Sequence, residues 1–178
     1  MAEPRDGRDG PRRFRYCIDL RATARRPIVD RSAAVDGSGV TVRPPIPADR
    51  DRLAELMLAS FRHTIDYEGE EIEQTTETVA EYLRQAALLD YSRLALVGGT
   101  AVSAVLAGDY DGAPYISYVM SAPEFRRRGI CRSLVAETLA RMERGGLVEV
   151  HLAITEGNVA SEGLFRSFGA YVDHPRSP

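Results

Sequence analysis

The residue types best suited to chemistry gather in one short arginine-rich segment. It consists of Arg126, Arg127, Arg128, Gly129, Ile130 and Cys131, with Arg132 directly after. A strand-like stretch ends at Pro123 before this segment, and a helical pattern begins at Gly129. The first N–H groups of a helix have no partner inside the helix, and the helix dipole adds roughly half a positive charge there. The segment is therefore typical of a site that binds phosphate or diphosphate.

The segment alone leaves the anion open. An isolated arginine triplet is more often a solvated helix start, but the strand before it and Gly129 within it favour anion binding. It is not a Walker loop, because no Gly-Lys-Ser/Thr follows, and it lacks the three-glycine pattern of a dinucleotide fingerprint.

A second motif follows further along the chain, in residues 158–169, which begin with Asn158 and end with Gly169. Taken together, the two segments resemble the GNAT superfamily of acyl-CoA-dependent N-acyltransferases over residues 39–178. The family's phosphate loop reads Arg/Gln-x-x-Gly-x-Gly/Ala, and Arg126, Gly129 and Cys131 stand at its defined positions. The family's second motif, Asn-x-x-Ala/Ser-x-x-Leu-Tyr-x-x-x-Gly, is similar to residues 158–169.

The resemblance implies acetyl-CoA as cosubstrate. Backbone amides of the arginine-rich segment would hold its pyrophosphate. The strand containing Val119, Met120 and Ser121 would pair with the pantetheine arm and offer a main-chain N–H to the thioester carbonyl. Asn158 would bind pantetheine, with Ser161 and Phe165 beside it. Asn158 is also a plausible cap of the last helix, and both roles can coexist.

Three positions depart from the family's pattern. Cys131 replaces a small residue, and we interpret it as a buried, inert thiol, although a helix N-terminus can lower a cysteine pKa. Phe165 stands where many relatives carry a tyrosine that protonates the leaving thiolate, so the donor is left open between Ser161, Tyr171 and water. Tyr115 stands where some relatives carry a catalytic glutamate.

The general base must come from elsewhere, and the acidic segment between the first two helices is the first candidate. Glu68 and Glu71 are our first choices, with a merely solvated loop as the alternative. An acidic pocket would attract a cationic amine. We therefore predict an N-acetyltransferase acting on a primary amine of a small molecule, peptide or protein. The alternative is a non-catalytic acyl-CoA-binding or sensory module.

Hydrophobic periodicity predicts the elements that position these residues. The expected order is β-α-α-β-β-β-α-β-α-β, a mixed α/β sheet with helices on both faces. The expected ranges are 40–43, 49–61, 75 or 76 to 87, 94–97, 102–107, 114–121, 129–144, 147–154, 159–168 and 170–172. A hairpin connection is expected at residues 109–112.

The N-terminal part is predicted to be an extension to a single domain. Residues 39–178 form the expected acetyltransferase domain, and residues 1–38 a partly flexible extension. Within the extension, residues 14–20 alternate enough for one strand, added to a sheet edge or to a partner.

Composition excludes several other classes of protein. Residues 1–45 hold ten arginines against six acids, but the whole chain has a net charge of −3. The acids interleave with the arginines, so we expect no nucleic-acid partner. No apolar run approaches the ~18 residues of a membrane span, and no secretory signal is evident. The two cysteines predict neither a disulfide nor a metal site, which favours a cytoplasmic protein. A homodimer is an expectation from the resemblance alone.

Overall fold

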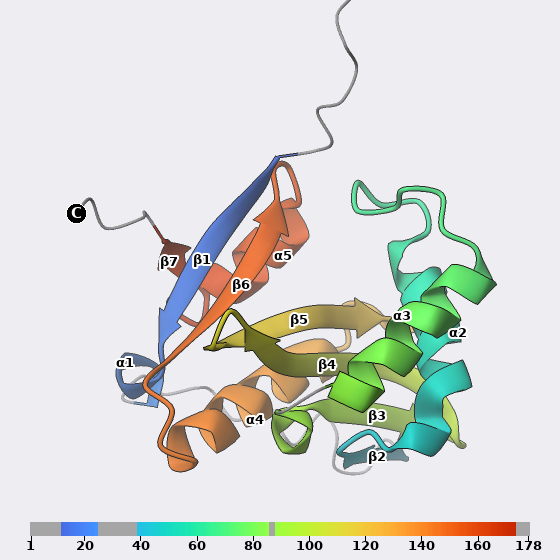
Figure 1. Ribbon diagram of the computed structural model, residues 1–178, viewed down its shortest axis with the longest axis horizontal. Coiled ribbons are helices and arrows are strands. Elements are labelled where there is room, and N and C mark those ends of the chain that lie inside the picture. Colours follow the sequence, from blue (N-terminus) through green and yellow to red (C-terminus); the bar gives the residue numbers. More distant parts are fainter. Residues whose placement is uncertain (1–11, 25–38, 86–87, 174–178) are drawn as a thin grey trace, which may run out of the picture.

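The computed structural model describes residues 12–24, 39–85 and 88–173. Its strands form one mixed seven-stranded sheet in the order β2-β3-β4-β5-β6-β1-β7 (Figure 1). The strands are β1 (Arg13–Asp19), β2 (Val40–Arg43), β3 (Arg93–Val97), β4 (Thr100–Tyr110), β5 (Ala113–Ser121), β6 (Glu149–Thr155) and β7 (Tyr171–Val172). The helices are α1 (Leu20–Ala24), α2 (Arg50–Phe61), α3 (Ile72–Gln85), α4 (Ile130–Arg144) and α5 (Val159–Arg166). In this described part of the chain, no helix is long and apolar enough to cross a membrane.

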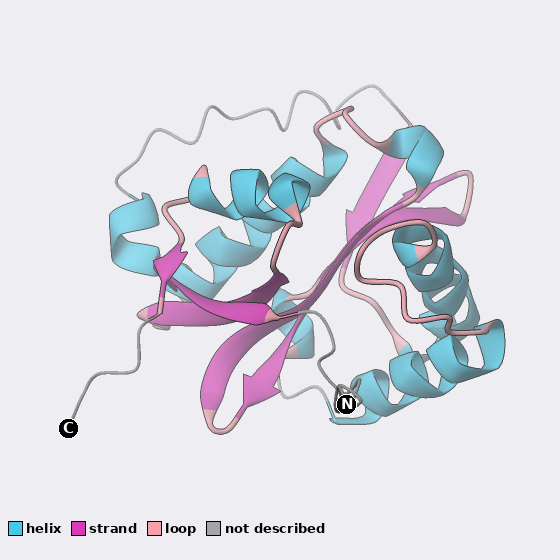
Figure 2. Ribbon diagram, turned by 90° about the horizontal axis from the view of Figure 1, so that it is seen from above, coloured by secondary structure: helices cyan, strands magenta, loops and turns pink. Residues whose placement is uncertain are grey.

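Helices cover both faces of the sheet, as Figure 2 shows. On one face, α2 and α3 pack against β3, β4 and β5 through buried residues such as Leu53, Val79 and Leu106. On the other, α4 and α5 pack through residues such as Leu134 and Phe165. This architecture confirms the predicted fold class. Each helix buries one apolar face, as the 3-4 spacing of its hydrophobic residues requires.

The N-terminal strand β1 lies inside the sheet, between β6 and β7. It runs antiparallel to β6 over its whole length, from Arg13 opposite Thr155 to Asp19 opposite Glu149. Tyr16 and Ile18 are buried in the same cluster as α4 and α5. The predicted strand therefore forms, but in an interior position and not at a sheet edge. The remainder of the predicted extension, residues 1–11 and 25–38, lies outside the described residues.

Helix α3 begins at Ile72, earlier than the two threonines that were expected to cap it. The hydroxyls of Thr75 and Thr76 donate to the carbonyl of Ile72, at 3.0 and 2.7 Å, so they act inside the first turn of the helix. The backbone N–H of Glu71 instead donates to the side-chain oxygen of Gln74 at 2.8 Å. This is one half of a capping box. The expected helix end at residues 86–87 lies outside the described residues.

The β4–β5 hairpin forms at the predicted place. Asp111 and Gly112 have φ values of 54° and 78°, which match the left-handed conformations of a type I′ turn. The backbone N–H of Gly112 also donates to the carboxylate of Asp109 at 2.8 Å.

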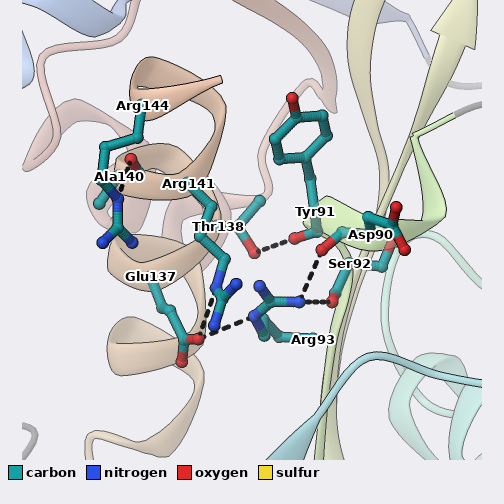
Figure 3. A network of polar contacts seen from close by, with 9 residues as sticks. All are labelled: Asp90, Tyr91, Ser92, Arg93, Glu137, Thr138, Ala140, Arg141 and Arg144. Carbon is teal, nitrogen blue, oxygen red and sulfur yellow. Dashed lines mark hydrogen bonds and ion pairs between the residues drawn. The ribbon is translucent and has the colours of Figure 1, made fainter.

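A buried polar network fixes α4 against the sheet (Figure 3). The Arg93 side chain on β3 is only 1% exposed and donates from Nε to Oε1 of Glu137 on α4 at 2.8 Å. Its Nη1 donates to the carbonyls of Asp90 and Ser92. Burial lowers the pKa of Arg93, and the hydrogen bond to Glu137 opposes that effect. The network holds the helix whose N-terminus carries the arginine-rich segment.

Candidate functional site: a cleft between diverging strands

The sheet opens where its two parallel strands, β5 and β6, separate. In the described structure they pair only at Tyr115 with His151 and at Ile116 with Leu152. Directly after this pairing, β5 carries an extra residue: Ala107 of β4 faces Ile116, and the next β4 residue back faces Tyr118. Ser117 is thus a bulge, and a bulge bends its strand and increases its twist. Figure 1 shows β6 rising away from β5 beyond this point.

A cleft of about 630 Å³ lies where these two strands separate, and both strands contribute to its lining. Side chains from β5, β6, α2, α5, the β4–β5 hairpin and the segment between α2 and α3 line it. Much of its lining is acidic and aromatic. The groups there include Asp66, Glu68, Glu70, Asp109, Tyr67, Tyr110, Tyr115 and Tyr118, with Arg13 of β1. Burial raises the pKa values of Tyr115 and Tyr118, so both phenols remain protonated hydrogen-bond donors near neutral pH.

The arginine-rich segment forms a loop and helix start just after β5. Arg127 has φ 61° and Gly129 has φ 82°, so two left-handed residues turn the chain into α4. Gly129 is the N-cap, and the first amide bonded back into the helix is that of Ser133, which donates to the Gly129 carbonyl at 3.0 Å. The amides of Ile130, Cys131 and Arg132 therefore face the helix N-terminus, the arrangement that binds phosphate.

The arginine side chains of this loop are partly committed to the protein itself. Arg126 donates to the carbonyl of Ser60 at 2.8 Å, which ties the loop to the end of α2. The guanidinium of Arg128 lies over the Phe125 ring at 4.9 Å, and Arg132 donates to Ser167 at 2.9 Å. Arg127 is exposed. The backbone amides at the start of α4 are thus the groups best placed to donate to an anion, and the arginines add positive potential.

Cys131 sits in the first turn of α4 with its thiol turned inward. Burial raises the pKa of this thiol, and hydrogen bonds with Ser121 and Ser103 offset only part of that effect. Desolvation therefore outweighs the helix dipole, which would lower the pKa. A protonated, unreactive thiol is the result.

The three residues 119–121, predicted to pair with pantetheine, do not all face the cleft. Val119 lines the cleft. Met120 is 1% exposed and belongs to the core under α2 and α3. Ser121 pairs with Ser103 of β4. Residues 126–132 are not part of the cleft lining but follow the strand that forms its wall.

Three residues of the second motif meet at the cleft: Asn158, Ser161 and Phe165. Asn158 caps α5, since its Oδ1 accepts the Ser161 N–H at 3.0 Å. Its Nδ2 donates to the Asp66 carboxylate at 2.6 Å. Phe165 is buried and offers no proton donor, so Ser161 is the hydroxyl that α5 brings to the cleft.

Only some of the candidate catalytic residues line the cleft. Glu68 lines the cleft and lies 3.4 Å from Arg13, in an exposed ion pair. Glu71 lies on the same segment but outside the lining. Tyr171 lies on β7, half exposed and away from the cleft, where a hydrogen bond with Cys17 and burial raise its pKa to about 12.

Sequence reasoning missed Asp66, Arg13 and Asp109 as cleft residues. Asp66 belongs to the acidic run and carried no distinguishing signal within it. Arg13 reaches the cleft only because β1 lies beside β6. Asp109 was assigned to the hairpin turn, where its carboxylate does accept a hydrogen bond.

Comparison with solved structures finds the same fold in several N-acetyltransferases. A GCN5-related N-acetyltransferase from Sphaerobacter thermophilus matches with a TM-score of 0.66 and 21% identity, over 93% of this chain and 50% of that one. This chain thus spans half the length of that relative. The PaiA N-acetyltransferase from Thermoplasma acidophilum, solved with coenzyme A, matches with a TM-score of 0.61 and 17% identity, over 72% of this chain and 87% of that one.

A third similar structure is the aminoglycoside N-acetyltransferase AAC(6')-Iy in complex with CoA. It matches with a TM-score of 0.59 and 21% identity, over 80% of this chain and 93% of that one. At these identities the similarity shows the fold. Comparison with curated proteins found no match.

The sequence itself matches a family model over most of the domain. The model of the acetyltransferase (GNAT) family covers residues 51–170, which include the loop before α4, the diverging strands and the cap of α5. The chain therefore belongs to the acetyltransferase (GNAT) family.

Proposed function

We propose that this protein transfers an acetyl group from acetyl-CoA to a primary amine by direct attack. The observation that carries the proposal is the cleft between β5 and β6, whose β5 wall leads into the arginine-rich loop and the N-terminus of α4. Acetyl-CoA would supply an activated thioester. The amides of residues 129–132 would hold its pyrophosphate, as the open helix start and its arginines support.

The remaining roles belong to the cleft. Beyond Ile116, the edge of β5 facing the cleft has no partner strand among the described residues, so its backbone groups are free to pair with an extended pantetheine arm. A main-chain N–H of residues 119–121 would stabilise charge on the thioester oxygen. Asn158 would border this arm, and Ser161 would be the hydroxyl placed to protonate the departing thiolate.

The acidic and aromatic lining of the cleft favours a cationic amine as the acceptor. Four carboxylates, those of Asp66, Glu68, Glu70 and Asp109, line the cleft, against the single guanidinium of Arg13 in that lining. Such a surface attracts ammonium groups, and the surrounding tyrosines add faces suited to cation–π contact. Glu68 is our candidate proton acceptor. The substrate class is thus a small molecule or peptide carrying a positively charged amine.

A second candidate function is acyl-CoA binding without catalysis. Phe165 and Tyr115 favour it, because they occupy the positions where relatives carry a proton donor and a glutamate.

Calorimetric titration of the purified chain with acetyl-CoA tests the first step, with ATP and NAD as controls. We expect stoichiometric binding of acetyl-CoA and no binding of either control. Thiol release with a panel of cationic and neutral amines then separates the two candidates. Binding without thiol release from any amine supports the non-catalytic module, and no binding by a folded sample refutes both.

A further inference from the structure

A cluster of metal-ligating side chains lies outside the cleft, where β1, β6 and β7 meet. Cys17 on β1 stands directly opposite His151 on β6. Glu149 lies two residues before His151 and therefore on the same face of β6. Asp173 directly follows β7. The proposed transfer reaction uses none of these four residues.

The ligand atoms of three of these residues lie close enough together to share one zinc ion. The atoms offered by Cys17, Glu149 and His151 all lie within 4.8 Å of one another. Cys17 Sγ is 3.8 Å from Glu149 Oε2, and His151 Nε2 is 3.4 Å from Glu149 Oε1. Zinc bonds of roughly 2.0–2.3 Å in a tetrahedron place the ligand atoms roughly 3.3–3.8 Å apart. Both distances lie in the range of such edges, one from each oxygen of the Glu149 carboxylate.

The histidine ring is also oriented as a ligand would be. His151 is 8% exposed, and in the described structure its Nδ1 is buried without a well-formed hydrogen bond. Asp173 Oδ2 nevertheless lies 3.3 Å from Nδ1. A metal-bound histidine commonly donates its second ring N–H to a carboxylate, which fixes the ring and raises its basicity. Arg15 lies 3.5 Å from the same Asp173 oxygen, so Asp173 already has a cationic partner and suits this outer role.

We propose that Cys17, Glu149 and His151 bind one zinc ion, with Asp173 orienting His151. Thiolate and carboxylate together balance the charge of the ion, imidazole is neutral, and the thiol proton is released to solvent. Glu149 is about half exposed, which leaves the ion accessible and a fourth position open to water. The ion would join β1 to β6, with the Asp173 contact extending the join to the end of β7.

The two cysteines alone predicted no metal site, because a pair of distant cysteines lacks ligand spacing. The fold supplies that spacing by placing Cys17 across from His151. Strand pairing holds these side chains on a rigid surface, so little ordering is needed when the ion binds.

Titration of the full, reduced chain with Co²⁺, followed by competition with Zn²⁺, tests this site. We expect one Co²⁺ per chain with a thiolate-to-cobalt charge-transfer band, which Zn²⁺ then abolishes, and a higher melting temperature with Zn²⁺. Cys17→Ser should remove the band, whereas the control Cys131→Ser should retain it. Asp173→Asn should keep the stoichiometry but weaken affinity roughly 10–100-fold.

Circular dichroism establishes that each variant is folded. If Cys17→Ser unfolds, the exposed Glu149→Gln replaces it, and at least a tenfold loss of affinity is expected. A folded wild-type chain that gives no charge-transfer band overturns the proposal. A band that persists in Cys17→Ser, or an unchanged affinity in Glu149→Gln, overturns it as well. None of these outcomes depends on acetyl transfer.

Discussion

At the scale of single residues, the acidic segment between α2 and α3 contains a natural pair for comparison. Glu68 and Glu71 have the same chemistry and lie three positions apart, but only Glu68 lines the cleft. Replacing Glu68 with glutamine removes a negative charge from the cleft lining. Replacing Glu71 removes the same charge from the surface outside it.

We therefore expect Glu68→Gln to raise the KM for a cationic amine several-fold, with a smaller effect on the KM for a neutral amine. It should also lower kcat for both amines, because the candidate proton acceptor is lost. Each lost carboxylate contact is worth on the order of 1 kcal/mol in a partly exposed site. Glu71→Gln should leave both constants near wild type. Steady-state thiol-release kinetics measure this, and equal effects of the two substitutions would contradict the assignment.

Asn158 gives a second prediction, because its two ends have separate tasks. Asn158→Ala removes the α5 cap and the bond to Asp66, and should cost about 1 kcal/mol from the cap alone. Asn158→Ser keeps a cap acceptor but cannot reach Asp66 in the same way. Thermal melts should therefore rank wild type, Ser and Ala in falling order. An Ala variant as stable as wild type would contradict the cap.

The sequence predicts part of this site well. The N-cap role of Asn158, one of the two roles expected for it, follows from its place at the start of the last helix. Asp66 could not be predicted as its partner, because they lie 92 residues apart and meet only through folding.

At the scale of elements, α4 is held by Arg93, and this contact has a matched control. Glu137 accepts hydrogen bonds from both Arg93, which is buried, and Arg141, which is exposed. Glu137→Gln leaves the buried guanidinium without its charge partner and should cost about 1–3 kcal/mol. Arg141→Ala should cost at most about 0.5 kcal/mol. Urea unfolding midpoints measure both, and equal losses would show that burial does not matter here.

The start of α2 depends on pH through Asp49. This carboxylate is 1% exposed, and burial alone would raise its pKa. Hydrogen bonds from Arg43, at 2.6 and 2.7 Å, and from the Ile46 amide reverse that effect and hold the pKa below its ordinary value. A depressed folded-state pKa stabilises the fold above the unfolded-state value, and the stability is lost as pH falls through the folded-state value.

Asp49→Asn should therefore lower the melting temperature most at neutral pH. The difference from wild type should shrink below about pH 4, where the unfolded carboxyl begins to bind protons. Calorimetric melts between neutral and acidic pH test this. A difference that is constant with pH would show that the effect is one of packing.

Element types followed from periodicity, but the start of α3 and the bulge in β5 did not. Helix α3 begins earlier than predicted because the hydroxyls of Thr75 and Thr76 donate to the Ile72 carbonyl inside the helix. A threonine can equally cap a helix, so the residue type alone does not decide between these two roles. The Ser117 bulge, which precedes the opening between β5 and β6, has no sequence signal of its own, since it exists only relative to the register of β4.

At the scale of the whole molecule, the interior position of β1 makes the N-terminal strand part of the fold. A chain beginning at Arg12 should melt cooperatively. A chain beginning at Leu20 loses Tyr16 and Ile18, whose burial contributes roughly 1.5–3 kcal/mol each, and also loses the backbone pairing of β6. That is a large part of a typical stability of roughly 5–15 kcal/mol. We expect this shorter chain to aggregate or remain unfolded, and a cooperative melt by circular dichroism would contradict the expectation.

Sequence alone predicts the β1 strand but not its neighbours. Alternation of apolar and polar residues defines which face of a strand is buried, yet the same pattern suits an edge, an interior position or a partner's sheet. Its interior position follows from the strand order of the described structure, in which β1 pairs with β6 on one side and with the very short β7 on the other.

The position of β1 also sets the order in which the protein can assemble. Tyr16 donates a hydrogen bond to Glu162, 146 residues further along the chain, so β1 cannot complete its contacts until α5, the last helix among the described residues, has been made. Closing so long a loop is entropically costly and slows folding. The β2–β5 half, built from neighbouring hairpins, can form while synthesis continues. Final closure of the sheet is then a late event, and until it happens the edge of β6 is open to pairing with other chains.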